Sequence, residues 1–235
     1  AANYFGALPI DRRPRVTIGT ATITVGPFAL RTSGGIVQTT TNTAIDSAQI
    51  EGGGGFSSNT WYYVYCSASG GGLVFEISTT APAANLRNKS GDASKIYVCS
   101  VRAGFGGSLI PCNVVDGRYR YDALLFAING GTDTTYTALD VSNLVPPTAT
   151  LASVTVQNIN NSTGGRTAAL RVIGTSAATF QVQTNNKYLI DLAGTTVANA
   201  NTASTEIAVD SSQTFEYQTS GASSFVTVWV TGYSE

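Results

Sequence analysis

Carboxylates are the side chains of this sequence with the clearest capacity for catalysis. The chain has no histidine, which excludes Ser-His-Asp and Cys-His nucleophilic sites and every histidine-ligated metal centre. Glycoside hydrolysis needs only two acids, so Asp116 with Asp122 and Asp133 with Asp140 are the candidate pairs. All four lie in turn-like stretches or on the outward side of strand-like stretches, where aspartate usually has a structural role. We therefore expect no catalytic residues and no enzyme activity.

Cysteine could serve as a metal ligand, a nucleophile or a disulfide partner. The three cysteines, Cys66, Cys99 and Cys112, are one too few for an all-cysteine zinc site, and none are spaced as CxxC. Cys66 and Cys99 lie in strand-like runs, which favours buried free thiols, while a Cys66–Cys99 bridge stays an alternative. No P-loop lysine motif occurs, and the glycine run at 52–55 is typical of a turn. We expect no cofactor and no metal ion.

Aromatic side chains are the best candidates for ligand binding. The run at 61–65, Trp-Tyr-Tyr-Val-Tyr, has the rings needed to stack on sugars. Consecutive aromatic residues on one strand face both sides of a sheet, however, which favours core packing for this run. Aromatic residues near expected loop tips, Phe56, Phe105 and Tyr136, are the candidate glycan contacts.

The charge content is low and nearly balanced. Only 11% of the residues are charged, and the formal net charge is −1. This argues against nucleic-acid binding, which needs a basic field. Such a surface is typical of a chain covered by copies of itself or by a larger assembly, although viral and secreted β proteins often share it. The one basic cluster, Arg12, Arg13 and Arg15, could pair with acidic groups on a neighbouring subunit or form a solvated turn.

Period-two alternation of apolar and polar residues dominates the chain and predicts antiparallel strands. Tyr119 and Tyr121, continued by Ala123, are expected on an inward face, opposite Arg118 and Arg120. In the second half, valines 226, 228 and 230 share one face, and the tryptophan at 229 occupies the other. Near the start, the parity of the apolar residues switches at Gly19, which suggests a bulge or twist in one strand.

These patterns predict an all-β fold of two antiparallel, jelly-roll-like β-sandwich domains, at 16–122 and 123–235. Residues 1–15 are expected to form an extended N-terminal anchoring arm. Its anchoring side chains would be Tyr4, Phe5, Leu8, Ile10, Arg12, Arg13 and Arg15. No signal peptide is visible at the start, and no run approaches the ~20 apolar residues of a membrane helix, so we expect no membrane insertion.

Several motifs together resemble a module of bacteriophage virion proteins. These are the aromatic strand at 59–65 (NTWYYVY), the turn at 79–82 (TTAP), and the strand at 97–102 (YVCSVR), where Cys99 replaces the usual glycine. The end of the chain, at 210–213, at Tyr217 and at 230–233, is similar to the terminal β-sandwich that accompanies this module. The resemblance covers most of residues 45–235.

The resemblance implies a non-enzymatic virion component of a tail fibre, head fibre or capsid decoration, commonly a homotrimer. Its partners would be copies of itself and other virion proteins of the capsid, portal, neck or tail, and it would be assembled in the host cytoplasm. No catalytic residues carry over from the family. The alternative is a receptor- or carbohydrate-binding module of a tail fibre that attaches to a host surface glycan.

Overall fold

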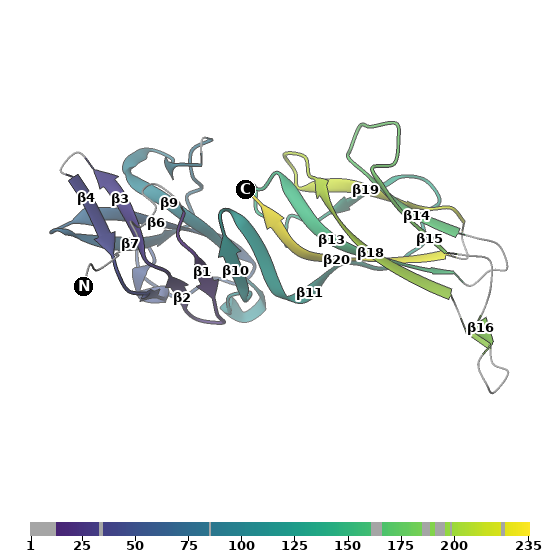
Figure 1. Ribbon diagram of the computed structural model, residues 1–235, viewed down its shortest axis with the longest axis horizontal. Helices are drawn as coiled ribbons and strands as arrows, with labels where there is room; N and C mark the ends of the chain where they lie inside the picture. The colour runs from purple at the N-terminus through teal and green to yellow at the C-terminus, as the bar shows by residue number, and fades with distance from the viewer. Residues whose placement is uncertain are drawn as a thin grey trace, which may run out of the picture. The chain divides into compact units, whose positions relative to one another are not determined.

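The computed structural model describes residues 13–32, 35–84, 86–160, 166–184, 189–190, 196–197, 199–221 and 224–235. The chain is built almost entirely of antiparallel β-strands (Figure 1). The all-β class predicted from the sequence is therefore confirmed. The chain divides into two units, unit 1 with residues 1–122 and unit 2 with residues 123–235. The expected anchoring residues Tyr4, Phe5, Leu8, Ile10 and Arg12 lie outside the described residues.

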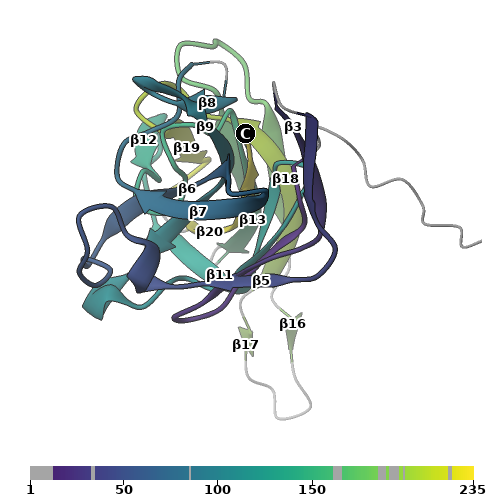
Figure 2. The ribbon, with the colours of Figure 1, turned by 90° about the vertical axis from the view of Figure 1, so that its left-hand side faces the viewer.

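Unit 1 contains two sheets and a separate hairpin. One sheet has the order β11-β10-β1-β2-β5, the second has the order β7-β6-β9-β8, and β3 pairs with β4. In Figure 2, which turns unit 1 toward the viewer, β6, β7 and β9 run side by side across the unit. The strands are β1 (Val16–Ile18), β2 (Ile23–Val25), β3 (Phe28–Thr32), β4 (Gly35–Thr39), β5 (Thr43–Ile45), β6 (Thr60–Ser69), β7 (Gly72–Ser78), β8 (Asn88–Lys89), β9 (Asp92–Ala103), β10 (Cys112–Val115) and β11 (Arg118–Gly131), with 3-10 turns η1 (Ser47–Gln49) and η2 (Phe105–Gly107).

The parity switch at Gly19 has a different cause from the one the sequence suggested. Gly19 does not lie in a bulge but opens the turn of a hairpin, in which its N–H donates to Thr22 O at 2.8 Å. The register pairs Ile18 with Ile23, and the apolar residues of both strands are buried, while Ala21 in the turn is exposed. A four-residue loop and a bulge change the parity alike, so alternation alone did not distinguish them.

The aromatic strand β6 forms the core of unit 1, as its alternation predicted. Tyr63 and Tyr65 are buried against Tyr97 of β9, with ring centroids 6.3 Å and 5.9 Å from that of Tyr97. The hydroxyl of Tyr65 donates to Thr80 O at 2.6 Å, which satisfies its polar end inside the core. The run at 61–65 is therefore a packing element rather than an exposed sugar platform.

The sheets of unit 1 meet through β9 and β11. The hydroxyl of Tyr119 accepts a hydrogen bond from Ser100 N at 2.9 Å. Tyr119 and Tyr121 are buried, and Arg118 is exposed, as the sequence predicted. The inward pattern stops there, however, because Ala123 is exposed where β11 passes from unit 1 into unit 2.

Unit 2 is also built from two main sheets, with the orders β18-β13-β20-β11 and β12-β19-β14-β15, and a short pair, β16 with β17. Valines 226, 228 and 230 of β20 are fully buried, and Trp229 is half-buried on the opposite face, which confirms both predictions. The strands are β12 (Thr137–Asp140), β13 (Leu151–Asn160), β14 (Arg166–Arg171), β15 (Phe180–Thr184), β16 (Leu189–Ile190), β17 (Thr196–Val197), β18 (Asn199–Ala208), β19 (Thr214–Thr219) and β20 (Ser224–Ser234).

A group of four charged side chains lies at one end of the β6–β9 sheet. The buried Lys89 Nζ is 2.8 Å from both Glu51 Oε2 and Glu76 Oε1, and Lys95 Nζ is 2.9 Å from Glu76 Oε2. Burial alone would raise the pKa of Glu76, but hydrogen bonds from Lys89 and Lys95 outweigh it and leave that pKa below 4.5. Burial likewise opposes the charge of Lys89, yet its hydrogen bonds to Glu51 and Glu76 raise its pKa.

All three cysteines are free and buried, which confirms the expectation for Cys66 and Cys99. Burial raises the pKa of Cys66 to about 12. Burial and the nearby Asp122 carboxylate raise the pKa of Cys112 to about 12 as well. Because the thiolate is the reactive form, we expect both thiols to react slowly in the folded chain.

The ion-pair group makes stability depend on acid pH. Because the folded pKa of Glu76 lies below its ordinary value of 4.5, its carboxylate stabilises the fold above about pH 4.5, and this contribution is lost as the pH falls through the folded pKa. We expect Glu76→Gln to lower the free energy of unfolding by about 1–3 kcal/mol at pH 7, with a smaller deficit at pH 3. Urea unfolding at both pH values measures this, with the exposed Glu206→Gln as control; an unchanged deficit at pH 3 would contradict the role of Glu76.

Thiol reactivity tests the burial of the cysteines. At pH 8, a thiol with a pKa of about 12 has a thiolate fraction roughly a thousandfold below that of an ordinary cysteine. We expect Ellman's reagent to react slowly with the folded protein and rapidly, at three thiols per chain, in urea. A Thr202→Cys variant, at an exposed position of β18, supplies the fast-reacting control. Rapid reaction of the folded wild-type protein at the control rate would show that the thiols are accessible.

Candidate functional site

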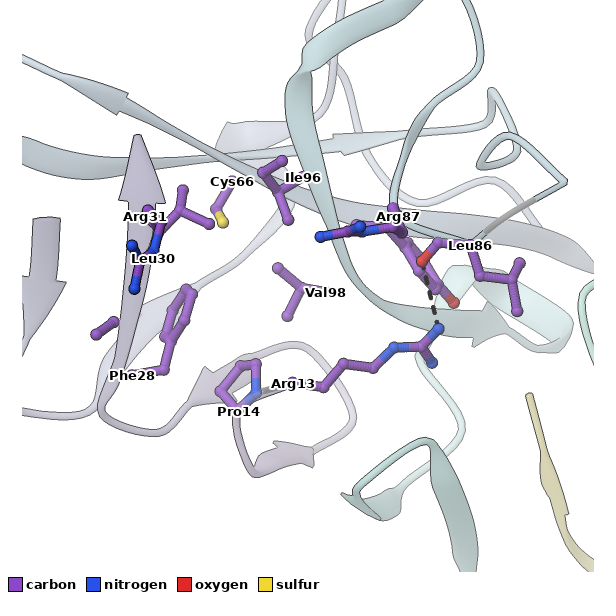
Figure 3. A pocket seen from close by; sticks show the side chains of 12 residues that line it. Arg13, Pro14, Phe28, Leu30, Arg31, Cys66, Leu86, Arg87, Ile96 and Val98 are labelled. Atoms are coloured by element: carbon purple, nitrogen blue, oxygen red, sulfur yellow. Dashed lines mark hydrogen bonds between the residues drawn. The ribbon is translucent and has the colours of Figure 1, made fainter. Parts of the chain in front are cut away.

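Unit 1 contains a cleft between β3 and β9 with a volume of about 300 Å³ (Figure 3). Apolar side chains form its inner surface, and three arginines, Arg13, Arg31 and Arg87, stand around it. In Figure 3, Arg31 and Arg87 lie on opposite sides of the cleft, and Arg13 lies below. We call this site the arginine cleft.

The apolar floor of the arginine cleft comes from the central strands of the β6–β9 sheet. Cys66 and Ile96 are direct neighbours in the register, so their side chains share a face. The register shifts after Val64, which pairs with Cys99, while Tyr65 pairs with Tyr97. This bulge leaves one extra residue, Val98, in β9, and its side chain points into the cleft beside those of Cys66 and Ile96 (Figure 3).

Arg13 is held in place by the wall of the cleft. Its Nη2 donates to Leu86 O at 3.4 Å, and its guanidinium lies 4.9 Å from the ring centroid of Tyr97. Arg31 and Arg87 are exposed at the rim. None of the described residues that line the cleft is acidic. The arrangement can bind an anion next to an apolar group, because the guanidinium fork matches a carboxylate and the floor excludes water.

Of the residues predicted to anchor the chain, two fall within the described part. Arg13 lines the arginine cleft. Arg15 is exposed, and its carbonyl accepts a hydrogen bond from Gly26 N at 2.8 Å. The segment from Arg13 to Arg15 therefore lies beside Gly26, which precedes β3. Of its two basic side chains, that of Arg13 contacts Leu86 and Tyr97 within unit 1.

The candidate glycan contacts lie in two places. In unit 1, Phe56 is half-buried and packs edge-on against Tyr62 at 5.3 Å, so it has a structural contact. Its loop meets the η2 turn, where Gly106 N donates to Ser58 Oγ at 2.9 Å, and Phe105 in that turn is 93% exposed. The structure thus brings together the loops of two of the three predicted aromatic residues.

The third candidate, Tyr136, lies in unit 2 beside a small polar hollow of about 170 Å³. The Arg171 guanidinium lies 3.8 Å from its ring centroid. In the register, Ala169 pairs with Gln181 on one side and Gln218 on the other, so a small side chain separates two amides. We call this site the Tyr136 hollow; it offers an aromatic ring and neutral hydrogen-bonding groups together.

The sequence did not identify two of the three arginines of the cleft. Arg31 follows a buried stretch of β3, and Arg87 follows the turn after the TTAP motif, so neither belongs to a local basic cluster. Positions 13, 31 and 87 are far apart along the chain, and only the fold brings them to one cleft. The one feature of the sequence that could have pointed to Arg31 and Arg87 is that each is an isolated charged residue in a chain with few charged residues.

Three of the four aspartates considered as glycosidase acids accept hydrogen bonds from other residues of the fold. Asp122 accepts from Asn113 Nδ2 at 3.0 Å, and Asp140 accepts from Ser142 N at 2.8 Å. The Asp133 carboxylate accepts a short hydrogen bond from the Tyr217 hydroxyl. Asp116 lies in a tight turn with a φ of 49°. These contacts match the turn and surface roles that their sequence positions favour.

No protein-family model matches the chain, and no curated protein matches it. Among the described residues, no group of three or more potential metal-ligating side chains occurs. The same residues contain no helix with the length and apolar character needed to cross a membrane.

Proposed function

We propose that this chain is a non-enzymatic structural component of a bacteriophage virion, a short fibre, spike or decoration protein of tail or capsid. In this proposal units 1 and 2 are jelly-roll-like β-sandwich domains, residues 1–15 form the anchoring arm, and the chain assembles as a homotrimer with other virion proteins. The resemblance of the aromatic strand and its neighbours to virion modules supports it, as does the low charge content of 11%.

The observation that carries the proposal is an apolar surface patch in unit 2. Leu124 and Phe126 of β11 are 56% and 58% exposed, and the Phe126 ring lies 5.7 Å from that of Trp229 on β20. We call these three residues the β11 patch. Adjoining large apolar side chains on a surface mark protein contacts, because covering one such side chain contributes about 1.5–3 kcal/mol. In the proposed homotrimer, a second copy of the chain covers the β11 patch.

Loss of the β11 patch should dissociate the oligomer. We expect the wild-type chain to have a trimer mass by native mass spectrometry and Phe126→Ser to shift it toward monomer, since the exposed serine leaves folding intact. Phe105→Ser is the matched control, because Phe105 is 93% exposed but lies outside the patch. A monomeric wild-type protein at tens of micromolar, or equal dissociation of both variants, would contradict the proposal.

The virion assignment has its own test. In purified particles of the phage that encodes this sequence, quantitative mass spectrometry should find the chain in a fixed copy number. Removal of residues 1–12, which keeps the contacts of Arg13 and Arg15 within unit 1, should prevent its incorporation and leave the cooperative unfolding of the rest unchanged. Normal incorporation of the truncated chain would refute the anchoring role of the arm.

The Tyr136 hollow favours a second candidate function, attachment to a host surface glycan. An aromatic ring next to neutral amides and hydroxyls, here Gln181, Gln218 and Ser220, is the chemistry that recognises an uncharged sugar. On a glycan array, the protein should bind a saccharide with saturable affinity, and Gln181→Ala should weaken that binding several-fold. Gln38→Ala, at an exposed position of β4, serves as the control. Equal binding by Gln181→Ala and the control would place the glycan elsewhere.

A further inference from the structure

The arginine cleft concentrates positive charge in a chain that has little charge elsewhere. Three of the 13 basic residues stand around one cavity, and none of the described lining residues is acidic. Guanidinium groups on opposite sides, those of Arg31 and Arg87, can approach one carboxylate from two directions (Figure 3). The charge of the cleft therefore favours an anionic ligand.

The floor of the cleft decides which anion fits. It is made by Phe28, Leu30, Cys66, Ile96 and Val98, all apolar side chains. Apart from the arginines and a tyrosine, the described lining contains no polar side chain. A sugar acid would leave several hydroxyl groups without hydrogen-bond partners there, at a cost for each one. The floor instead suits a carboxylate whose neighbour is an apolar side chain.

The edge of β3 provides the third component of the site. Among the described residues, β3 pairs only with β4, so its other edge has no strand partner. Four consecutive residues, 28–31, line the cleft. Successive side chains of a strand point to opposite faces, so a cavity lined by four in a row runs along the strand edge. Such an edge can accept the main chain of an added strand.

The cleft also continues along that edge. A second hollow of about 620 Å³ shares Leu30, Arg31 and Ile96 with the arginine cleft. It is lined further on by serines 67, 69 and 94 and by Lys95, whose ammonium group pairs with Glu76. The two cavities together form a groove along β3, with Arg31 where they meet. A groove of this shape suits an extended ligand of several residues better than a compact one.

We propose that the arginine cleft and this continuation bind an extended peptide segment of a partner protein, in which acidic residues alternate with apolar ones. The segment adds as a strand to β3, its carboxylates bind Arg31 and Arg87, and its apolar side chains pack on the floor between Phe28 and Val98. The inference rests on the proposed function in one respect: a structural component of an assembly has proteins as its partners, so the ligand is taken to be a protein.

Fluorescence anisotropy with the full chain tests this directly. The probe is a labelled, end-blocked peptide, Leu-Asp-Val-Asp-Leu, and its partner probe has asparagine in place of both aspartates. We expect the acidic probe to bind about tenfold or more tightly than the amide probe, and salt to weaken it. Arg31→Gln and Arg87→Gln should each weaken binding about tenfold, and urea unfolding of each variant confirms that the loss is not one of folding. Both side chains are exposed at the rim. Arg118→Gln, an exposed arginine of β11, should leave it unchanged.

Three results would overturn the inference: no binding of the acidic probe at millimolar concentration, equal binding of both probes, or equal loss in Arg118→Gln. Binding of glucuronate or N-acetylneuraminate without binding of the peptide would also overturn it, in favour of an acidic sugar. The test is separable from that of the proposed function. A chain found in virions that ignores the peptide refutes only the cleft inference, and a chain that binds the peptide but is missing from virions refutes only the virion assignment.

Discussion

The burial of tyrosine along β6 is the constraint on which unit 1 depends. Tyr63 and Tyr65 fill the space between sheet and turn and pack against Tyr97, which brings β9 beside β6. A buried tyrosine needs a partner for its hydroxyl, and Tyr65 finds one in the carbonyl of Thr80. That hydrogen bond fixes the turn after β7, and the chain then leads to Arg87 at the rim of the arginine cleft. The aromatic core therefore positions the site, although no tyrosine of β6 lines it.

The core of unit 2 combines aliphatic residues of β13 and β20 with buried aromatic residues, Phe215, Tyr217 and Tyr233. Valines of β13 and β20 face each other in register, and buried polar side chains follow at one end of this pair, namely Asn158, Asn160 and Ser224. Asn158 is fully buried and donates from Nδ2 to the carbonyls of Arg166 and Val182, both at 3.1 Å. These bonds tie β13 of one sheet to β14 and β15 of the other, so a single amide fixes how the two sheets align. A core of interchangeable valines gains its specificity from such a contact.

Much of the fold could be predicted because alternation reports directly on burial. It correctly placed Tyr119 and Trp229, since each lies in a long strand with one covered face. It failed at Gly19, because a hairpin loop and a bulge shift the parity in the same way. It failed again at Ala123, where β11 leaves the core of unit 1. The arginine cleft was out of reach for a different reason: its parts come from separate strands and turns, and no local pattern encodes their meeting.

The scarcity of charge makes the remaining charges informative. Several are used within the fold: Lys89 forms ion pairs with two glutamates, and Arg171 pairs with Glu216 in unit 2. Arg102 is buried, donates to Asn59 O at 2.6 Å and lies over a tryptophan ring. Each of these contacts stabilises the structure that holds it. Arg31 has no such contact with a described residue, and an exposed cation beside an apolar floor contributes nothing to folding that a neutral side chain would not. The peptide ligand proposed for the arginine cleft would give Arg31 the anionic partner that the described part of the fold does not supply.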